Sequence, residues 1–362
     1  MYEISLCMIV KNEEKNLERC LSAIATLVDE VIIVDTGSTD RTVEIAHKYT
    51  DKVYDFTWVN DFSQARNYSI SKASYEYILV LDSDELTQSI DLKEMKRLLS
   101  DNPTKIGRLL RINEYTRKGI LYRYKERVNR LFSKKHYHYE GIIHEQIIGF
   151  PQIDDIDFMD LQNSEDETYL IPLTVLHSGY EGDVLTRSKK TERNISLLML
   201  AHEQHPRDPY ILYQLGKSYY MQEDYQNASE YFGIALEYDL DVRLEYVQDM
   251  VESYGYSLIN SGRFDIAMQL LNVYDEFAHS TDFIFLIALI LMNNGKFIEA
   301  IGEFIKASKR SEAKMEGVNG YLAYYNIGVI YECLDDKTNS IMYYKKCGDY
   351  TLAKQRLKDL NR

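Results

Sequence analysis

The sequence has 362 residues, of which 45% are hydrophobic and 27% charged, so a disordered chain is excluded. At about 100–200 residues per domain, this length predicts two domains, each with its own core. The formal net charge of -15 disfavours nucleic acids and anionic membranes as principal partners, because such a surface repels phosphate groups.

The sequence is expected to contain no signal peptide and no membrane-spanning segment. The first residues, MYEISLCMIVKNEE, carry no basic segment and no cleavage pattern. The longest apolar run, Phe283 to Met292, is too short to span a bilayer. We therefore expect a cytoplasmic protein with no transmembrane segment. The cysteines lack Cys-x-x-Cys spacing and are expected to be reduced and buried; they are Cys7, Cys20, Cys333 and Cys347.

Residues 1–182 alternate between short apolar runs and segments with helical spacing. Strands are expected at residues 4–10, 31–34, 53–56 and 77–81, and helices at residues 13–27, 42–49 and 62–73. Short apolar strands separated by helices predict a parallel α/β sheet covered on both faces. Ligands of such sheets bind beyond the carboxyl ends of the strands. Asp35, Asp82 and Asp84 all follow strands, which places them at the expected binding edge.

The Asp82-Ser-Asp84 motif leaves its strand with two carboxylates that can face one ligand. Hard oxygen ligands of this kind suit Mg²⁺ or Mn²⁺ bridging to a diphosphate. A solvated turn is the alternative for such a pair, and the strand immediately before it favours the metal. Asp35, at another strand end, is well placed to accept hydrogen bonds from a base or a ribose. In its loop, Gly37 is expected to turn the chain and Asp40 or a neighbouring hydroxyl to cap the next helix.

Residues 183–362 are helical by pattern and contain four copies of one arrangement of small and large residues. Their small positions are Gly216 and Ala228, Gly255 and Ala267, Ala288 and Ala300, and Gly328 and Ser340. A small residue lets two antiparallel helices approach closely, while large residues fill the layer between hairpins. The copies resemble tetratricopeptide repeats, although the usual Trp and closing Pro are missing.

Four motifs in the first domain resemble one family in their order and spacing. They are Cys7-Met-Ile-Val-Lys-Asn-Glu-Glu14, Val34-Asp-Thr-Gly-Ser-Thr-Asp-Arg-Thr42, Asp61-Phe-Ser-Gln-Ala-Arg-Asn67 and Leu81-Asp-Ser-Asp-Glu85. Together they resemble family-2 glycosyltransferases of the GT-A fold, in the branch that carries C-terminal tetratricopeptide repeats. Within it the chain is similar to bacterial enzymes that glycosylate peptides, including the S-glycosyltransferases of glycosylated bacteriocins.

The resemblance implies transfer of a sugar from a nucleotide-sugar donor, a UDP-sugar, in one inverting displacement. It also implies an α/β GT-A domain with a Rossmann-like mixed sheet at residues 1–182 and a helical repeat domain at residues 183–362. In that domain Val10 and Glu13 would line the nucleotide pocket, and Asp35 would contact the uracil.

The same resemblance assigns the remaining donor and metal contacts. Arg66 would lie near the pyrophosphate or the sugar, while Asp82 and Asp84 would hold the ribose and the metal. The cofactor is expected to be Mn²⁺ or Mg²⁺, which stabilises the departing diphosphate while a carboxylate activates the acceptor.

Two later motifs provide the other candidates. His144-Glu145 follows an apolar pair interpreted as a strand, so its two side chains should face opposite sides and only one can face the sugar. By analogy with relatives we favour Glu145 as the general base; a core-facing or surface carboxylate is the alternative. His177 ends the strand expected at residues 173–176 and is predicted to complete the metal's coordination or to stabilise the domain junction.

Other features are open to more than one interpretation. Arg127 and Arg130 are interpreted as solvated charges, with contact to a diphosphate or acceptor as the alternative. Residues 154–167 are expected to form an acidic loop within the first domain. The repeats are expected to hold a peptide or protein acceptor or to pair two chains as a homodimer. The alternatives are a cell-envelope or secondary-metabolite acceptor, or an inactive scaffold.

Overall fold

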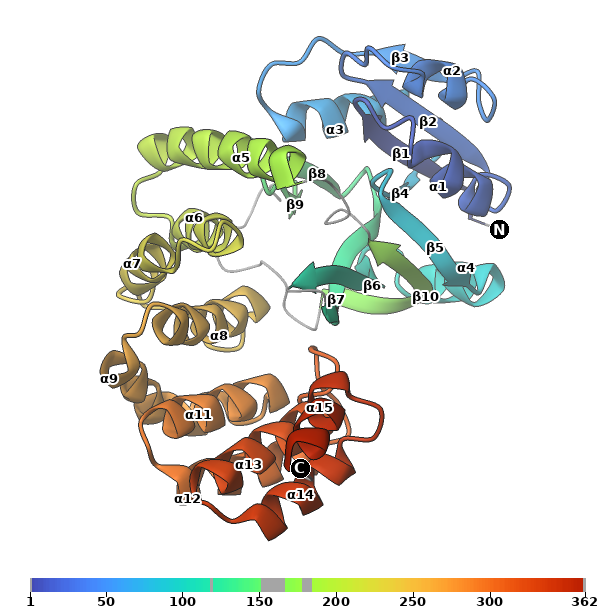
Figure 1. The fold of residues 1–362 in the computed structure, drawn as a ribbon. Helices are drawn as coiled ribbons and strands as arrows, with labels where there is room; N and C mark the ends of the chain where they lie inside the picture. Colours follow the sequence, from blue (N-terminus) through green and yellow to red (C-terminus); the bar gives the residue numbers. More distant parts are fainter. Residues whose placement is uncertain (1, 118–119, 151–166, 178–183, 361–362) are drawn as a thin grey trace. The chain divides into compact units, whose positions relative to one another are not determined.

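The computed structural model describes residues 2–117, 120–150, 167–177 and 184–360, and the chain divides into two compact units, Met1–Pro206 and Arg207–Arg362 (Figure 1). The boundary expected after residue 182 falls within residues 178–183, which lie outside the described residues, as does most of the expected acidic loop. Helix α5 (Val184–Gln204), expected to begin the repeat domain, belongs instead to the first unit.

The first unit is built on an eight-stranded mixed sheet with the order β3-β2-β1-β4-β7-β6-β10-β5. The strands in chain order are Ile4–Val10, Glu30–Asp35, Val53–Asp55, Tyr77–Val80, Glu85–Ile90, Ile106–Arg117 and Ile120–Ser133 for β1 to β7, and Thr168–His177 for β10. Strands β3, β2, β1 and β4 are parallel, as predicted from their buried apolar runs. Strand β7 is antiparallel to β4 and β6, and β5 is antiparallel to β10.

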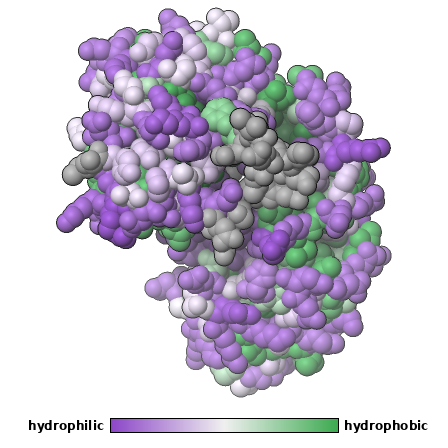
Figure 2. Space-filling view, turned by 180° about the vertical axis from the view of Figure 1, so that it is seen from behind, coloured by the Kyte–Doolittle hydropathy of each residue, from purple (hydrophilic) through white to green (hydrophobic). Residues whose placement is uncertain are grey.

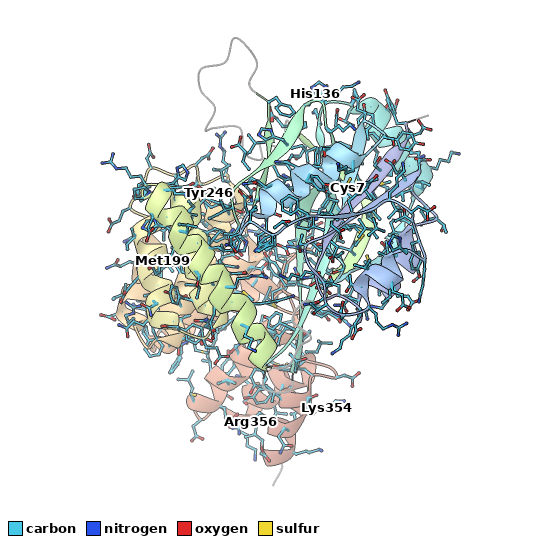
Figure 3. The ribbon with its side chains drawn as sticks, turned by 90° about the horizontal axis from the view of Figure 1, so that it is seen from above. Cys7, His136, Met199, Tyr246, Lys354 and Arg356 are labelled. Atoms are coloured by element: carbon cyan, nitrogen blue, oxygen red, sulfur yellow. The ribbon has the colours of Figure 1, made fainter. Side chains whose placement is uncertain are left out.

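Both faces of the sheet are covered, as predicted. Helices α1 (Leu17–Ile24), α2 (Thr42–Ala46) and α4 (Leu92–Asp101) pack on one face. Helix α3 (Phe62–Lys72) packs on the other face, together with a two-stranded sheet of β8 (Tyr137–Glu140) and β9 (Gln146–Gly149). Cys7 of β1 lies beneath α3, and its thiol donates to Ser69 O at 3.7 Å (Figure 3).

The long β6–β7 hairpin extends the sheet beyond the carboxyl end of β4. On the side away from β1, strand β4 pairs with the last residues of β7, from Tyr77 opposite Ser133 to Leu79 opposite Leu131. The earlier residues of β7 therefore continue past the edge at which Asp82 leaves the sheet. Strand β10 runs parallel to β6 and ends with His177 opposite Asn113. Polar residues of β6, β7 and β10 consequently lie next to the expected binding edge.

The second unit consists of antiparallel helical hairpins. Its helices are α6 (Pro209–Met221), α7 (Tyr225–Ala235), α8 (Glu245–Asn260), α9 (Phe264–Ala267), the 3-10 helix η1 (Met268–Val273), α10 (Tyr274–Phe277), α11 (Thr281–Asn293), α12 (Phe297–Ser308), α13 (Tyr321–Cys333), α14 (Lys337–Lys346) and α15 (Thr351–Leu360). The four predicted copies correspond to the hairpins that begin with α6, α8, α11 and α13. In the second hairpin the returning helix is broken into α9, η1 and α10, which the sequence pattern did not indicate.

The glycines of the repeats occupy the close helix contacts that their pattern predicted. A Cβ atom added to Gly216 would lie 2.5 Å from the ring of Phe232, and one added to Gly328 would lie 2.6 Å from the ring of Tyr344. Both rings are fully buried. The glycine and the aromatic residue therefore form one packing unit in the first and the last hairpin.

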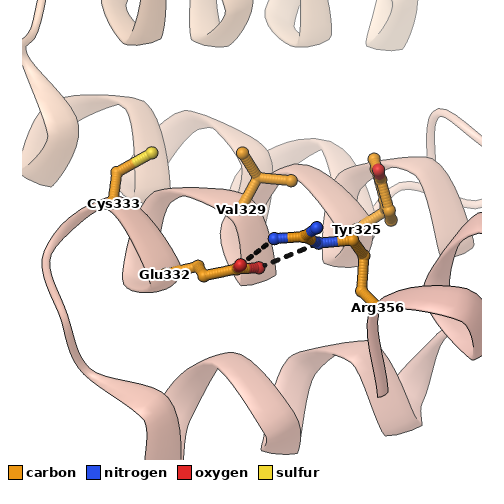
Figure 4. Close-up of a pocket in the computed structure, with 5 residues that line it drawn as sticks. All are labelled: Tyr325, Val329, Glu332, Cys333 and Arg356. Carbon is orange, nitrogen blue, oxygen red and sulfur yellow. Dashed lines mark hydrogen bonds and ion pairs between the residues drawn. The ribbon is translucent and has the colours of Figure 1, made fainter. Parts of the chain in front are cut away.

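A cavity of about 360 Å³ lies between α13 and α15 and is lined by Tyr325, Val329, Glu332, Cys333 and Arg356 (Figure 4). Arg356 forms an ion pair with Glu332, which also accepts a hydrogen bond from Tyr344 at 2.8 Å. These contacts fasten α15 to the last hairpin. Cys333 is an exposed free thiol, so the expectation that every cysteine is buried is wrong at this position. Cys7, Cys20 and Cys347 are buried and free, as expected.

Hydrophilic residues dominate the surface seen in Figure 2. Within the part of the chain that the structure describes, no helix combines the length and apolar character that crossing a bilayer requires. The apolar run that ends at Met292 forms most of α11, and its residues from Phe283 to Ala288 are buried in the second unit.

Glu252 on α8 makes the stability of the second unit depend on pH. Burial raises the pKa of Glu252 from 4.5 to about 7, with Asp282 and Asp249 raising it and Lys314 and a hydrogen bond from Ser280 lowering it. A carboxyl group whose pKa is higher in the folded state destabilises that state when it ionises. Wild-type stability should therefore fall between about pH 4.5 and 7, by about 3 kcal/mol from this group.

Glu252→Gln should remove this part of the pH dependence, because the amide does not ionise. The measurement is urea unfolding of both proteins at pH 5 and pH 7.5, with the variant gaining stability relative to wild type at the higher pH. The same difference at both pH values would contradict the assignment.

Candidate active site

Two loops at the carboxyl edge of the sheet are joined by hydrogen bonds. Asn12, in the left-handed region at φ 55°, donates its backbone N–H to Ser38 Oγ at 2.9 Å, and its side chain accepts from the N–H of Thr39 at 2.8 Å. Thr42 Oγ1 accepts from the N–H of Glu13 at 2.7 Å. These hydrogen bonds join the loop after β1 to the loop after β2. They explain why the sequence motifs in both loops are polar.

Val10, Glu13 and Asp35 lie on these two loops or at the strand ends that lead into them. Val10 is the last residue of β1 and pairs with Asp35, the last residue of β2. Both are buried, and the Asp35 carboxylate accepts N–H groups of Gly37 and Ser38 at 2.9–3.2 Å. Asp35 thus stabilises the loop that follows it, and it lies at the carboxyl edge of the sheet where a ligand is expected.

Asp82 lies between two buried arginines. Arg66 of α3 donates to Asp82 Oδ1 at 2.8 Å, and Arg130 of β7 donates to Oδ2 at 2.8 Å. Arg130 also donates to Glu85 Oε1 at 2.8 Å, and Glu85 accepts from Arg111 at 3.0 Å. Burial by itself raises the pKa of Asp82, but the two arginines outweigh it and hold this pKa far below its usual range. Asp82 is therefore a permanent carboxylate.

Arg130 was interpreted from sequence mainly as a solvated charge, and the structure corrects that interpretation. Its side chain is 10% exposed and contacts two carboxylates of the site. Arg130 directly precedes Leu131, which is paired with Leu79 of β4. Its side chain therefore lies next to the carboxyl end of β4. Sequence alone gave no register for this antiparallel pair.

Glu145 also belongs to this group of buried arginines and carboxylates around Asp82. Its carboxylate accepts from Arg66 Nε, and its side chain is 10% exposed. The strand expected before it is absent, since residues 141–145 form a bend between β8 and β9 with His144 in the left-handed region at φ 51°. The argument that His144 and Glu145 alternate across a strand is therefore wrong. The bend in the backbone, and not the alternation of side chains along a strand, directs Glu145 to Arg66.

The Asp61–Asn67 motif builds this part of the site through α3. Asp61 caps the helix by accepting from Gln64 N at 3.0 Å. Ala65 is fully buried against the sheet, and Arg66 faces the carboxylates. The Asn67 side chain pairs with both backbone groups of Tyr139, at 2.8 and 2.9 Å, and so holds β8 against α3.

Asp84 and His177, the two candidate metal ligands from the sequence, lie close together. His177 Nε2 lies 3.5 Å from Asp84 Oδ2, and both side chains are largely buried. Burial raises the pKa of Asp84, but the hydrogen bond and charge of His177 outweigh it and lower this pKa. Burial raises the pKa of Glu13, and the neighbouring Asp84 carboxylate adds to the rise.

Asn113 and Glu126, on the β6–β7 hairpin, form a second layer behind His177. The Asn113 amide donates to Glu126 at 2.5 Å, and its oxygen lies 2.7 Å from His177 Nδ1. Arg111 donates to Glu126 at 2.9 Å. The sequence analysis assigned no role to Arg111, Asn113 or Glu126, and it named Glu85 only as the last residue of a motif. The only available signal was the run of polar residues along two strands that must border the binding edge.

Comparison with known proteins assigns a family to part of each unit. Residues 5–150 match the model for Glycosyl transferase family 2. The first unit carries a family 2 glycosyltransferase domain. Tetratricopeptide-repeat models match residues 212–240 and 321–354 of the second unit. The sequence-based recognition of a GT-A domain followed by tetratricopeptide repeats is therefore confirmed.

Relatives of the glycosyltransferase domain include two that match over most of this chain. A TPR repeat-containing protein of Synechococcus elongatus is 34% identical over 221 residues, which are 60% of this chain and 52% of the relative. The SPbeta prophage-derived glycosyltransferase SunS of Bacillus subtilis is 30% identical over 241 residues, 63% of this chain and 52% of SunS. The chain thus spans about half the length of these curated relatives.

A solved structure of glucosyl-3-phosphoglycerate synthase from Mycobacterium tuberculosis, in complex with Mn²⁺ and uridine-diphosphate-glucose, is also similar to the glycosyltransferase domain. It is 22% identical, with a TM-score of 0.27, and the match covers 30% of this chain and 44% of that one.

Proposed function

We propose that the chain is an inverting, metal-dependent glycosyltransferase that transfers a sugar from a UDP-sugar to a peptide or protein acceptor. Asp84 and His177 would bind Mn²⁺ or Mg²⁺, Asp82 and Arg66 would contact the donor, and Glu145 would accept the proton of the acceptor. Val10, Glu13 and Asp35 would line the nucleotide pocket. The repeats of the second unit would hold the acceptor.

The convergence of Asp84 and His177 is the observation that carries this proposal. Asn113 donates its amide N–H to Glu126, so its oxygen accepts the Nδ1 proton of His177. The other ring nitrogen, Nε2, lies 3.5 Å from Asp84 Oδ2. An imidazole nitrogen and a carboxylate oxygen this close together could both bind one divalent cation.

A divalent cation fits this donor set. Imidazole nitrogen and carboxylate oxygen are both ligands of Mn²⁺, and a histidine ligand usually donates its other N–H to a supporting group, as His177 does to Asn113. Among the described residues no group of three His, Cys, Asp or Glu side chains converges on one point. The remaining coordination positions would therefore go to water and diphosphate oxygens, as is usual for Mg²⁺ bound with nucleotides.

The chain's own residues account for the rest of the chemistry. When bound, the cation would offset the negative charge that develops on the departing diphosphate. Asp82, kept ionised by Arg66 and Arg130, would orient the donor through hydrogen bonds. Glu145 would remove the acceptor's proton as the new bond forms.

Thermal unfolding with nucleotide sugars tests the proposal. UDP-glucose or UDP-N-acetylglucosamine at about 100 times its dissociation constant should stabilise the first unit by about 2.7 kcal/mol, or several degrees in Tm. The shift should require Mn²⁺ or Mg²⁺ and vanish in EDTA, with GDP-mannose as the control for the base. Equal shifts with and without the metal, or no shift with any UDP-sugar, would contradict the proposal.

A further inference from the structure

Three buried polar atoms around Asp82 have no hydrogen-bond partner among the described residues. They are Arg66 Nη1, Arg130 Nε and the hydroxyl of Tyr139. Their residues are 7%, 9% and 3% exposed, respectively. Buried polar groups in folded proteins almost always have a partner, and leaving one without costs about 1–3 kcal/mol. A group other than these side chains therefore completes the cluster.

The three atoms belong to residues that surround Asp82, whose side chain is partly exposed. Arg66 and Arg130 each donate to one oxygen of Asp82, and the Asp82 side chain is 31% exposed. The guanidinium carbon of Arg66 lies 5.5 Å from the centre of the Tyr139 ring. Asn67 holds the backbone of Tyr139 in place, so this ring is fixed beside Arg66.

The missing group must offer an oxygen atom that accepts hydrogen bonds. Both guanidinium atoms can only donate. Burial raises the pKa of Tyr139 to about 12, so its hydroxyl also keeps a proton to donate. Water, a hydroxyl group or a phosphate oxygen could each accept these bonds.

The local charge disfavours a phosphate oxygen and leaves a neutral hydroxyl group or water. Three arginines, Arg66, Arg111 and Arg130, face four carboxylates, and one negative charge is therefore in excess; the carboxylates belong to Asp82, Glu85, Glu126 and Glu145. A phosphate would add further negative charge beside them. A neutral hydroxyl group can accept from the donors and give its own proton to a carboxylate, which satisfies both sides of the cluster.

We propose that Arg66 and Tyr139 bind one hydroxyl group of the donor's sugar and so determine which sugars the site takes. The inference rests on the proposed function, because it requires a nucleotide sugar whose sugar lies beside Asp82. It adds Tyr139 as a specificity-determining residue. The site loses this hydrogen bond with a sugar that lacks the hydroxyl, and the buried donors are then left without a partner.

Tyr139→Phe tests the inference, because it keeps the ring and removes only the hydroxyl. Affinity is measured by titration calorimetry in Mn²⁺ with UDP, which has no sugar, and with UDP-glucose and UDP-N-acetylglucosamine. We expect the affinity for UDP to stay unchanged and that for the wild type's preferred UDP-sugar to fall about 10- to 100-fold. A deoxy analogue lacking the recognised hydroxyl should bind both proteins equally.

Tyr137→Phe is the matched control. Tyr137 lies on the same strand, β8, and its hydroxyl already donates to Thr104 O at 2.7 Å. This variant should bind UDP and UDP-sugars like the wild type. If Tyr139→Phe also keeps wild-type affinity for UDP-sugars, water fills the cluster and the inference is overturned. Loss of UDP as well as UDP-sugar overturns it too, since the hydroxyl then acts through the fold. If the wild type binds no UDP-sugar, the proposed function fails first.

Discussion

Asp84→Asn is expected to lower Mn²⁺-dependent turnover of a UDP-sugar by about a hundredfold or more. The substitution keeps an oxygen atom but removes the charge that faces His177 Nε2 at 3.5 Å. The cation would then be held by one neutral imidazole and one neutral amide. Release of UDP measured across a Mn²⁺ titration should show a higher half-saturating concentration, and electron paramagnetic resonance should show more free Mn²⁺ at a given total.

Asp91→Asn is the matched control for this result. Asp91 caps α4 by accepting from Glu94 N at 3.0 Å and lies outside the candidate site. Its variant should lose some stability but keep the wild-type dependence on Mn²⁺. If Asp84→Asn is folded and turns over the donor at the wild-type rate at every Mn²⁺ concentration, Asp84 is not a metal ligand. His177→Ala should then also leave the metal dependence unchanged.

Glu145→Gln is expected to lower sugar transfer to a hydroxyl acceptor by about 10²–10⁴-fold, the usual effect of a positioned proton acceptor. The amide keeps the size of Glu145 and can still accept a hydrogen bond from Arg66. Donor affinity should therefore stay close to wild type. The loss should be smaller for a peptide with a cysteine than for its serine counterpart, because a thiol with a pKa of about 8.5 is partly ionised near neutral pH.

Because Glu145 forms an ion pair with Arg66, the thermal stability of Glu145→Gln should be measured as well. Arg66 is buried and keeps Asp82 as a partner when the charge of Glu145 is removed. A fall in thermal stability with an unchanged transfer rate would make Glu145 a structural partner of Arg66. His144 would then be the next residue to substitute. Glu140→Gln, at the 61% exposed end of β8, serves as the control and should change neither quantity.

Several features of this site follow from local sequence pattern. Short apolar runs predicted the strands, and a residue that directly follows a parallel strand must lie at the carboxyl edge of the sheet. Asp35, Asp82 and Asp84 were placed correctly on that basis. In the repeats, the spacing of Gly216 and Gly328 predicted close helix contacts. These predictions need only the spacing of apolar and small residues along a helix or strand and the direction of the chain.

Other features depend on contacts between distant segments, which no local pattern encodes. Arg130 lies 48 residues from Asp82 in the sequence, and Glu145 lies 79 residues from Arg66. A bend with a left-handed His144 replaced the expected strand, because the chain turns there between β8 and β9. Its sequence, Gly-Ile-Ile-His-Glu, has the apolar character of a strand, so periodicity could not reveal the turn.

The sequence by itself determined the two kinds of unit, the strand ends that carry the aspartates and the small residues of the repeats. Only the tertiary structure decided which side chains meet Asp82 and what supports His177. The physical reason is the register of β7 against β4 and β6, which is set by burial across the whole sheet. A shift of one residue there would turn Arg130 and Glu126 to the opposite face of the sheet, away from Asp82 and Asn113.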